Sequence, residues 1–343
     1  MLAHSWFLKG FLLLVAAAAL SVLLRQGKVL QIPYAAPNPV RAILLEEKAL
    51  PWWDGGGCGC DGAGLCLPKA APRLSWEDAG GACGLRAWAA GEGQRVISFS
   101  LYGNDVKYWK AFEKNLDSMK GLFPGWAAWV YTDPRGREDV LCPLLQDFPY
   151  LYVCDVTNLP SFGDVTSIHN MVWRALPLGD ARVSAFVVRD SDALLLERDA
   201  EAVKEWLSGN KSFHLLRDHP WHTALIMGGL WGARWGHQGE PARRSLAAVR
   251  DAVVQEARGR FKKGADQSLL RKVLYPKMKG DLVAHDSYFC TKYPDGSRPF
   301  PTQRKNGTYV GNYMGARAVD PLLVREPCPL ECRPRNHQDW TYC

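Results

Sequence analysis

The sequence has no run of lysine and arginine, no internal repeat and little net charge. The charge of +7, from 42 basic and 35 acidic residues, is mild and spread along the chain. These absences exclude a basic nucleic-acid-binding arm and a fibrous repeat. With 47% hydrophobic and 22% charged residues, wholesale disorder and a multi-span membrane protein are excluded too. The 343 residues therefore indicate one large or two small globular domains with no nucleic-acid partner.

The N-terminal region contains one uncharged stretch, Gly10–Leu24. It falls between a signal-peptide core of ~7–15 residues and a full span of ~20. The small residues Ala16–Ala19 could supply a cleavage site, but apolar residues continue past them. We expect an uncleaved signal anchor with the bulk of the chain in the lumen of the secretory pathway; secretion after cleavage is the alternative.

Ten cysteines, an even number, agree with an oxidising lumen. They predict disulfides whose pairing the sequence does not reveal. The alternative is a zinc site on the first four, although their spacing matches no common zinc module. Those four are Cys58, Cys60, Cys66 and Cys83.

The expected organisation is a tail over 1–8, an anchor over 9–24, a proline-rich stem with a disulfide-tied collar over 25–93, and a catalytic domain over 94–343. From residue 94 onward, β-rich runs alternate with helical patterns. This alternation predicts an α/β domain with a mixed, mostly parallel sheet flanked by helices. Strands are expected at 96–102, 126–131, 150–154 and 183–188, and helices at 105–122, 137–146, 166–176 and 199–208.

Two carboxylates, Asp190 and Asp192, directly follow the hydrophobic strand expected at 183–188. Carboxylate oxygens are the ligands that Mg²⁺ and Mn²⁺ prefer. Ligands of parallel α/β sheets bind at the carboxyl ends of strands, which also points to Tyr102 and Asp133. The sequence thus predicts a cation site after this strand; a solvated aspartate-rich turn is the alternative.

A second group of polar residues lies further along, in the segment Arg217–His222. Trp221, Trp231 and Trp235 could offer flat faces to a sugar ring. The pair Gly228-Gly229 would let backbone approach a ligand closely. Asp266 stands where a helix begins, and it either meets substrate or caps that helix. His285 is either a ligand of the same cation or a structural histidine.

An Asp-x-Asp after a strand, a later Asp266-Gln267 and a still later His285 resemble the motif order of GT-A-type nucleotide-sugar glycosyltransferases, which have a Rossmann-like fold. The anchor and stem resemble those of Golgi type II transferases, which implies a single-pass membrane protein of the Golgi or ER. The resemblance covers about residues 94–290. It implies Mn²⁺ or Mg²⁺, a nucleotide-diphosphate sugar donor, and a glycan, protein or lipid acceptor.

The resemblance also implies roles for individual residues. Asp190, Asp192 and His285 match the metal ligands, and Leu101-Tyr102-Gly103 matches the loop that meets the nucleotide. Asp218, which we prefer, or Asp266 would be the catalytic carboxylate. Further donor contacts are expected from Asp133, Arg174, Arg189, Arg217, Gly228 and Gly229.

Two other functions fit the same residues. A metallohydrolase could assemble Asp190, Asp192, Asp218, His222 and His285 around water-activating metals, although no H-E-x-x-H motif is present. A lumenal carbohydrate-binding protein could keep the fold without turnover.

Overall fold

The computed structural model describes Trp53, Cys58 and residues 81–236, 238–262, 264–305, 307–314 and 326–343. The expected tail and anchor, and most of the expected stem, lie outside these residues. None of the helices within these ranges combines the length and the apolar character needed to cross a bilayer.

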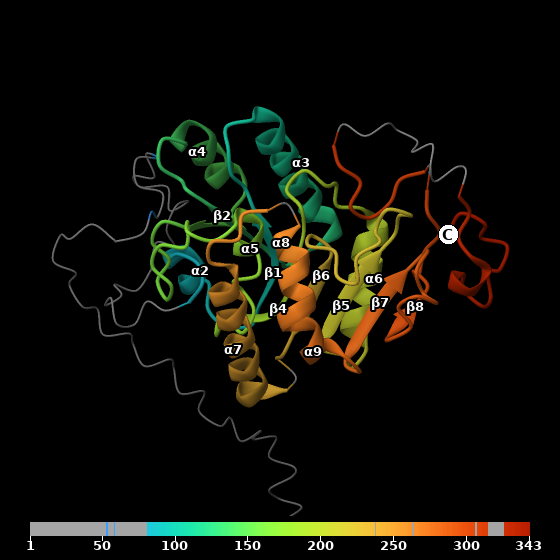
Figure 1. Ribbon diagram of the computed structural model, residues 1–343. Coiled ribbons are helices and arrows are strands. Elements are labelled where there is room, and N and C mark those ends of the chain that lie inside the picture. The colour runs from blue at the N-terminus through green and yellow to red at the C-terminus, as the bar shows by residue number, and fades with distance from the viewer. Residues whose placement is uncertain are drawn as a thin grey trace, which may run out of the picture. The chain divides into compact units, whose positions relative to one another are not determined.

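Eight strands form one sheet in the order β3-β2-β1-β4-β6-β5-β7-β8 (Figure 1). Neighbouring strands run parallel except at β6, which is antiparallel to both β4 and β5. The mixed, mostly parallel sheet flanked by helices confirms the predicted fold class. The strands are β1 Gln94–Ser100, β2 Ala127–Thr132, β3 Leu151–Asp155, β4 Val183–Val188, β5 Phe213–Arg217, β6 Trp231–Arg234, β7 Leu282–Asp286 and β8 Ser297–Arg298.

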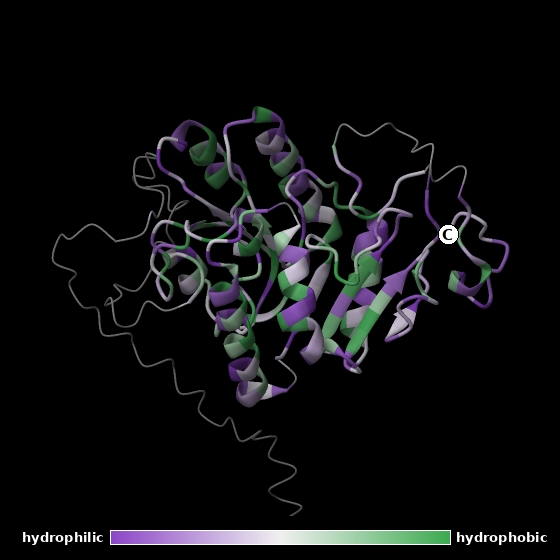
Figure 2. Cartoon of the chain, in the orientation of Figure 1, coloured by the Kyte–Doolittle hydropathy of each residue, from purple (hydrophilic) through white to green (hydrophobic). Residues whose placement is uncertain are grey.

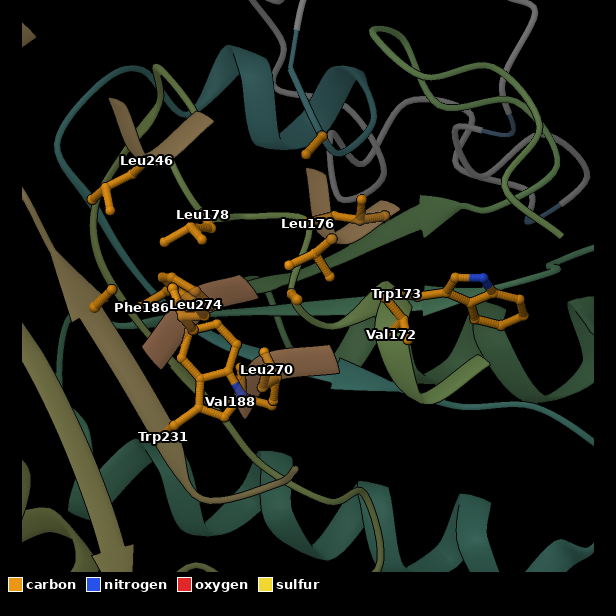
Figure 3. Packing of buried hydrophobic residues seen from close by; sticks show 14 of the residues in the cluster. Val172, Trp173, Leu176, Leu178, Phe186, Val188, Trp231, Leu246, Leu270 and Leu274 are labelled. Carbon is orange, nitrogen blue, oxygen red and sulfur yellow. The ribbon is translucent and has the colours of Figure 1, made fainter. Parts of the chain in front are cut away.

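The central strands are apolar on both sides because helices cover both faces of the sheet. Along β4, Phe186 and Val188 pack into one hydrophobic core, whereas Val187 between them packs into the other. This alternation follows from the two-residue period of a strand. Figure 2 shows green, hydrophobic colour on strands of the sheet and mixed green and purple along helix α7. Figure 3 shows Leu270 and Leu274 packed near Phe186, Val188 and Trp231 in the first core.

The helices divide between the two faces. On the face of Val187 lie α3 Val106–Leu122, α4 Glu138–Asp147 and α6 Glu197–Ser208. The face of Phe186 is covered by α5 Asn170–Trp173, α7 Gly239–Ala257 and a continuous run of α8 Ala265–Leu269, a π-helical segment Leu270–Leu274 and α9 Tyr275–Met278. A short helix, α2 Leu85–Ala89, precedes β1.

Two expectations about helices were incomplete. The helix predicted over 166–176 shrinks to α5, because the backbone of Ile168 pairs with Arg258 and the His169 side chain caps the helix by accepting from the Met171 amide. The 19-residue α7 was not predicted at all. Arg174 caps the C-terminal end of α5, and the chain beyond it continues in tight turns.

Four disulfides within the described residues confirm the predicted use of the cysteines. They join Cys58 to Cys142, Cys83 to Cys154, Cys290 to Cys332 and Cys328 to Cys343. Two of the cysteines that a zinc site would have needed, Cys58 and Cys83, are therefore oxidised, so the zinc alternative is wrong for them. Cys60 and Cys66 lie outside the described residues.

The Cys83–Cys154 disulfide ties the segment before β1 to the end of β3 across 71 residues of chain. Loop-closure entropy predicts that replacing both cysteines by alanine lowers the free energy of unfolding by about 4 kcal/mol. Removing Cys328–Cys343, which spans 15 residues, should cost about 3 kcal/mol. Urea unfolding of the two double variants measures whether the loss of Cys83–Cys154 costs more than the loss of Cys328–Cys343. An unchanged free energy of unfolding in the variant without Cys83–Cys154 would contradict the prediction.

Candidate functional site

A cleft lies where β1 and β4 end, and it has two lobes. The inner lobe has a volume of about 180 Å³ and is lined by Asp192, Ser191, Leu101 and Ser100. The outer lobe has about 670 Å³ and is lined by His222, Gly228, Gly229, Asp266 and Phe261, among others. The lobes share Tyr102, Tyr108, Met171, Arg174 and Asp190, so they form one continuous cleft.

Strand pairing explains why residues far apart in sequence meet here. β1 and β4 are parallel neighbours, so the residues after Ser100 and after Val188 leave the sheet at the same edge. β6 runs the other way, with Trp231 opposite Val188, so the glycine pair before β6 reaches that edge too. The backbone of Met314 also donates to the carbonyl of Asp192, which brings the segment around Gly311 to the cleft.

Arg174 is the central charge of the cleft. Its side chain is 3% exposed and forms ion pairs with Asp190, through Nη1, and with Asp266, whose Oδ2 lies 3.2 Å from Nη2. Burial by itself lowers the pKa of Arg174, but the two carboxylates outweigh this and raise the pKa above its ordinary value. The guanidinium therefore stays charged and holds together two acidic groups that would otherwise repel each other.

The glycine pair makes room for these carboxylates. A Cβ at Gly228 would come within 3.0 Å of the Asp266 carboxylate, and one at Gly229 would come within 3.0 Å of the Asp190 carboxylate. We expected the pair to admit a ligand to the backbone. The structure shows instead that it admits two aspartate side chains of the chain itself.

Replacing Gly229 by alanine should displace Asp190 and lower the free energy of unfolding by about 1–3 kcal/mol, because a well-packed site cannot absorb the added methyl. Gly121→Ala is the matched control. Gly121 lies in α3, and apart from its own helix backbone and chain neighbours no atom of the described residues lies within 4 Å of the position that an added methyl group would take, so this change should stabilise by up to about 1 kcal/mol. Urea unfolding compares the two, and equal effects would contradict the packing argument.

Asp192 completes the acidic part of the cleft. Burial raises the pKa of Asp192, and the negative charge of Asp190 adds to the shift. A divalent cation between them would relieve this repulsion. Within the described part of the chain, no three or more His, Cys, Asp or Glu side chains are placed to hold a metal ion by themselves. Two carboxylates suit Mg²⁺ or Mn²⁺ that arrives with a phosphate ligand, since such ions use one or two carboxylates plus substrate oxygens.

His285 does not join the two aspartates. It is fully buried on β7, and its Nδ1 lies 2.8 Å from His214 Nε2 while its own Nε2 lies 3.4 Å from Glu205 on α6. Both ring nitrogens therefore face groups other than the cleft, whose lining does not include His285. In the sheet, β6 and β5 separate β7 from β4. The geometry thus argues against the expected role of His285 as a cation ligand.

Asp218, preferred from sequence as the catalytic carboxylate, is buried with its oxygens fully engaged. Oδ1 accepts hydrogen bonds from Arg198, Arg304 and Ser287, and Oδ2 accepts from Arg198 and the backbone of Val310. The arginines hold the pKa of Asp218 far below its ordinary value despite burial. A carboxylate in this environment is a poor proton acceptor, so the structure argues against Asp218 as a base.

Two other arginines expected at phosphates are also committed to internal pairs. Arg189 forms two hydrogen bonds with Asp199, at 2.7 and 2.6 Å. Arg217 Nε lies 2.6 Å from Asp286. Of the three arginines proposed from sequence, only Arg174 lines the cleft.

The residues at the strand ends divide in the same way. Leu101 and Tyr102 line the cleft, and Tyr102 is 40% exposed. Gly103 and Asp133 do not line either lobe. The Gly103 carbonyl accepts from Arg137, and Asp133 accepts from the backbone of Arg135.

Sequence reasoning missed two aromatic residues of the cleft, Tyr108 and Phe261. Tyr108 lies in the first turn of α3, directly after the strand-end loop, which was the available signal. Phe261 follows α7, which was itself not predicted. Trp231 and Trp235, considered as sugar-stacking groups, are buried against Phe186, whereas Trp221 is 74% exposed.

Three buried histidines should make the fold sensitive to acid. Burial lowers the pKa of His214, His222 and His285 below the ordinary 6.5. Below about pH 6.5 the unfolded chain takes up protons that the native protein does not, so stability falls as pH falls. We expect the melting temperature to drop between pH 6.5 and 4.5.

His214→Phe keeps a ring against Trp206 and removes one of the three histidines. The free energy of unfolding of this variant should therefore fall less steeply with falling pH than that of wild type, by up to about 1.4 kcal/mol per pH unit. Leu330→Ala, at an exposed side chain without a titratable group, should keep the wild-type slope. A wild-type melting temperature that stays constant over this pH range would contradict the prediction.

No protein-family model matches the sequence, and no curated protein does. Solved structures with a similar fold include a glycosyltransferase involved in glycosylation of the major capsid of PBCV-1, at 12% identity and a TM-score of 0.34 over 59% of this chain and 87% of that one. The mannosyltransferase PcManGT from Pyrobaculum calidifontis, in complex with GDP-Man and Mn²⁺, has 12% identity and a TM-score of 0.28 over 43% and 47%.

A third similar structure is 4-diphosphocytidyl-2C-methyl-D-erythritol synthase from Anaerococcus prevotii DSM 20548, at 10% identity and a TM-score of 0.36 over 57% of this chain and 88% of that one. Identities and scores this low transfer neither a substrate nor a residue role to this chain.

Proposed function

We propose that this protein is a metal-dependent glycosyltransferase that uses a nucleotide-diphosphate sugar. The observation that supports the proposal best is the placement of Asp190 and Asp192 directly after the buried strand β4, in a cleft that Arg174 and Tyr102 also line. Of the motifs noted in the sequence, Asp190-x-Asp192 and Asp266 line this cleft, whereas His285 does not.

In this proposal, Asp190 and Asp192 are the residues that would hold Mn²⁺ or Mg²⁺, and the ion would supply positive charge to offset the negative charge of a diphosphate leaving group. Arg174 counterbalances Asp190 and keeps it oriented toward the inner lobe. Tyr102, at the end of β1, presents a half-exposed ring to the nucleotide, and Trp173 supports that ring edge-on with 6.2 Å between centroids.

Sugar transfer forms a bond from an acceptor oxygen to the anomeric carbon and breaks the bond from that carbon to the phosphate oxygen. The diphosphate keeps the electron pair, and the acceptor loses a proton. We propose that Asp266, and not Asp218, contacts the sugar hydroxyls, because Asp266 lines the outer lobe. If the anomeric centre inverts, Asp266 is the carboxylate placed to accept the proton.

We further propose that the protein works in the secretory pathway. In this proposal the N-terminal segment anchors it in the membrane, and the described domain lies in the lumen. Four disulfides support an oxidising compartment. The metallohydrolase alternative has less support, since Asp218 and His285 are committed to other partners and do not assemble with Asp190 and Asp192.

Asp192→Asn should weaken Mn²⁺-dependent binding of a nucleoside diphosphate about 10- to 100-fold, the loss expected for one charged contact. The variant should melt no lower than wild type, because burial and Asp190 already disfavour the charged form of Asp192. Calorimetric titration with UDP and with GDP, with and without Mn²⁺, measures the effect. Asp117→Asn, an exposed aspartate on α3, is the control and should bind normally.

Unchanged affinity and unchanged Mn²⁺ dependence in Asp192→Asn would show that the cation site is assigned wrongly. Normal nucleotide binding without sugar transfer to any acceptor would favour the alternative of a carbohydrate-binding protein.

A further inference from the structure

The segment Arg217–His222, which the donor site does not use, is held rigidly beside the outer lobe. Arg217 donates to Asp286 and to the carbonyl of Leu225. The carboxylate of the next residue, Asp218, accepts five hydrogen bonds. Such dense pairing of buried charges fixes the backbone from which His222 projects.

His222 has a defined hydrogen-bonding state. Its Nδ1 accepts from the backbone N–H of Asp218 at 3.1 Å. Burial lowers the pKa of His222 to about 4, so the ring is neutral at pH 7. A neutral imidazole carries one proton, and with Nδ1 acting as acceptor that proton is on Nε2. His222 therefore brings a neutral N–H donor to the wall of the outer lobe.

An exposed aromatic ring lines the same lobe, and another belongs to the residue next to His222 in the sequence. Phe261 lines the outer lobe and is 58% exposed. Trp221, the neighbour of His222, is 74% exposed, and its ring packs edge-on against His219 at 5.6 Å. His219 in turn lies 4.3 Å from the Tyr309 ring. A flat apolar ring in the same lobe as a neutral donor suits a ligand that has both apolar faces and hydroxyl groups.

The charged groups of the outer lobe disfavour an acidic acceptor. Within the described lining, the charged groups are Arg174, Asp190 and Asp266. Arg174 is already paired with both carboxylates. Apart from the cation that Asp190 and Asp192 would hold for the diphosphate, the described lining offers an acidic group of a sialylated, sulfated or phosphorylated acceptor no unpaired arginine or lysine side chain, which is unfavourable.

We propose that the outer lobe binds a neutral oligosaccharide as the acceptor, with His222 Nε2–H donating to a sugar hydroxyl and with Phe261 against a sugar face. This inference rests on the proposed transferase function, and it narrows the acceptor from glycan, protein or lipid to a glycan without acidic groups.

The test begins with the full-length protein on an array of neutral, sialylated and sulfated oligosaccharides, with an unglycosylated polypeptide included. Neutral glycans should bind best. The tightest of them is then titrated calorimetrically into His222→Ala, His222→Gln and Phe261→Ala. His222→Ala and Phe261→Ala should each weaken binding about fivefold, the loss of one contact worth ~1 kcal/mol. His222→Gln, which keeps an N–H donor, should recover part of the affinity.

Leu330→Ala is the matched control, because Leu330 is 57% exposed, as Phe261 is, but lines neither lobe. It should bind glycan normally. All the variants should bind UDP or GDP with Mn²⁺ as wild type does. Phe261→Ala keeps the test valid if His222→Ala unfolds, since Phe261 lies outside the Arg217–His222 segment.

Preference for acidic glycans or for the bare polypeptide would overturn the inference. So would a His222→Ala variant that loses nucleotide binding while glycan binding persists, because His222 would then serve the donor. The protein could instead bind neutral glycans in a way that depends on His222 but bind no nucleotide. In that case the outer lobe would remain assigned as a glycan-binding site, and the transferase proposal would be wrong.

Discussion

The site is organised around one buried cation, the guanidinium of Arg174, between the carboxylates of Asp190 and Asp266. Removing one partner of a buried ion pair typically costs about 3–5 kcal/mol, because the remaining charge stays desolvated. The sequence meets this constraint in two places. Helix α5 ends at Trp173, so Arg174 turns into the cleft, and the glycine pair before β6 leaves space for both carboxylates. Asp192 is the remaining carboxylate of the cleft, and none of the described ion pairs joins it to an arginine.

The edge of the sheet at which the cleft lies carries two kinds of polar group. The first kind is paired within the protein, and the second kind lines the cleft. Arg189 with Asp199, Arg217 with Asp286, and Asp218 with Arg198 and Arg304 satisfy one another in the interior. These pairs hold loops in place, and their members do not line the cleft. Tyr102, Asp192 and His222 line the cleft and keep groups that can contact one. Density of acids, bases and histidines in the sequence is therefore a poor guide to the site unless each partner is known.

The sequence predicted well what depends on local pattern. The strand at 183–188 has the predicted bounds, and the aspartates after it do enter a cleft at the carboxyl end, with Tyr102 from the neighbouring strand. The sequence-based predictions failed for residues whose contacts are with partners far away in the chain. His285 lies on β7 against His214 and Glu205, and the engagement of Asp218 depends on Arg304, 86 residues away. No local spacing encodes those contacts, nor the exposed ring of Phe261 after the unpredicted α7.

The most direct measurement is the position of Mn²⁺, located by its anomalous X-ray scattering in crystals of the protein grown with a nucleoside diphosphate. The account predicts a single strong peak between Asp190 and Asp192, with diphosphate oxygens as further ligands and Arg174 still beside Asp190. A peak at His285 and Glu205, or a nucleotide bound away from the cleft, would contradict it.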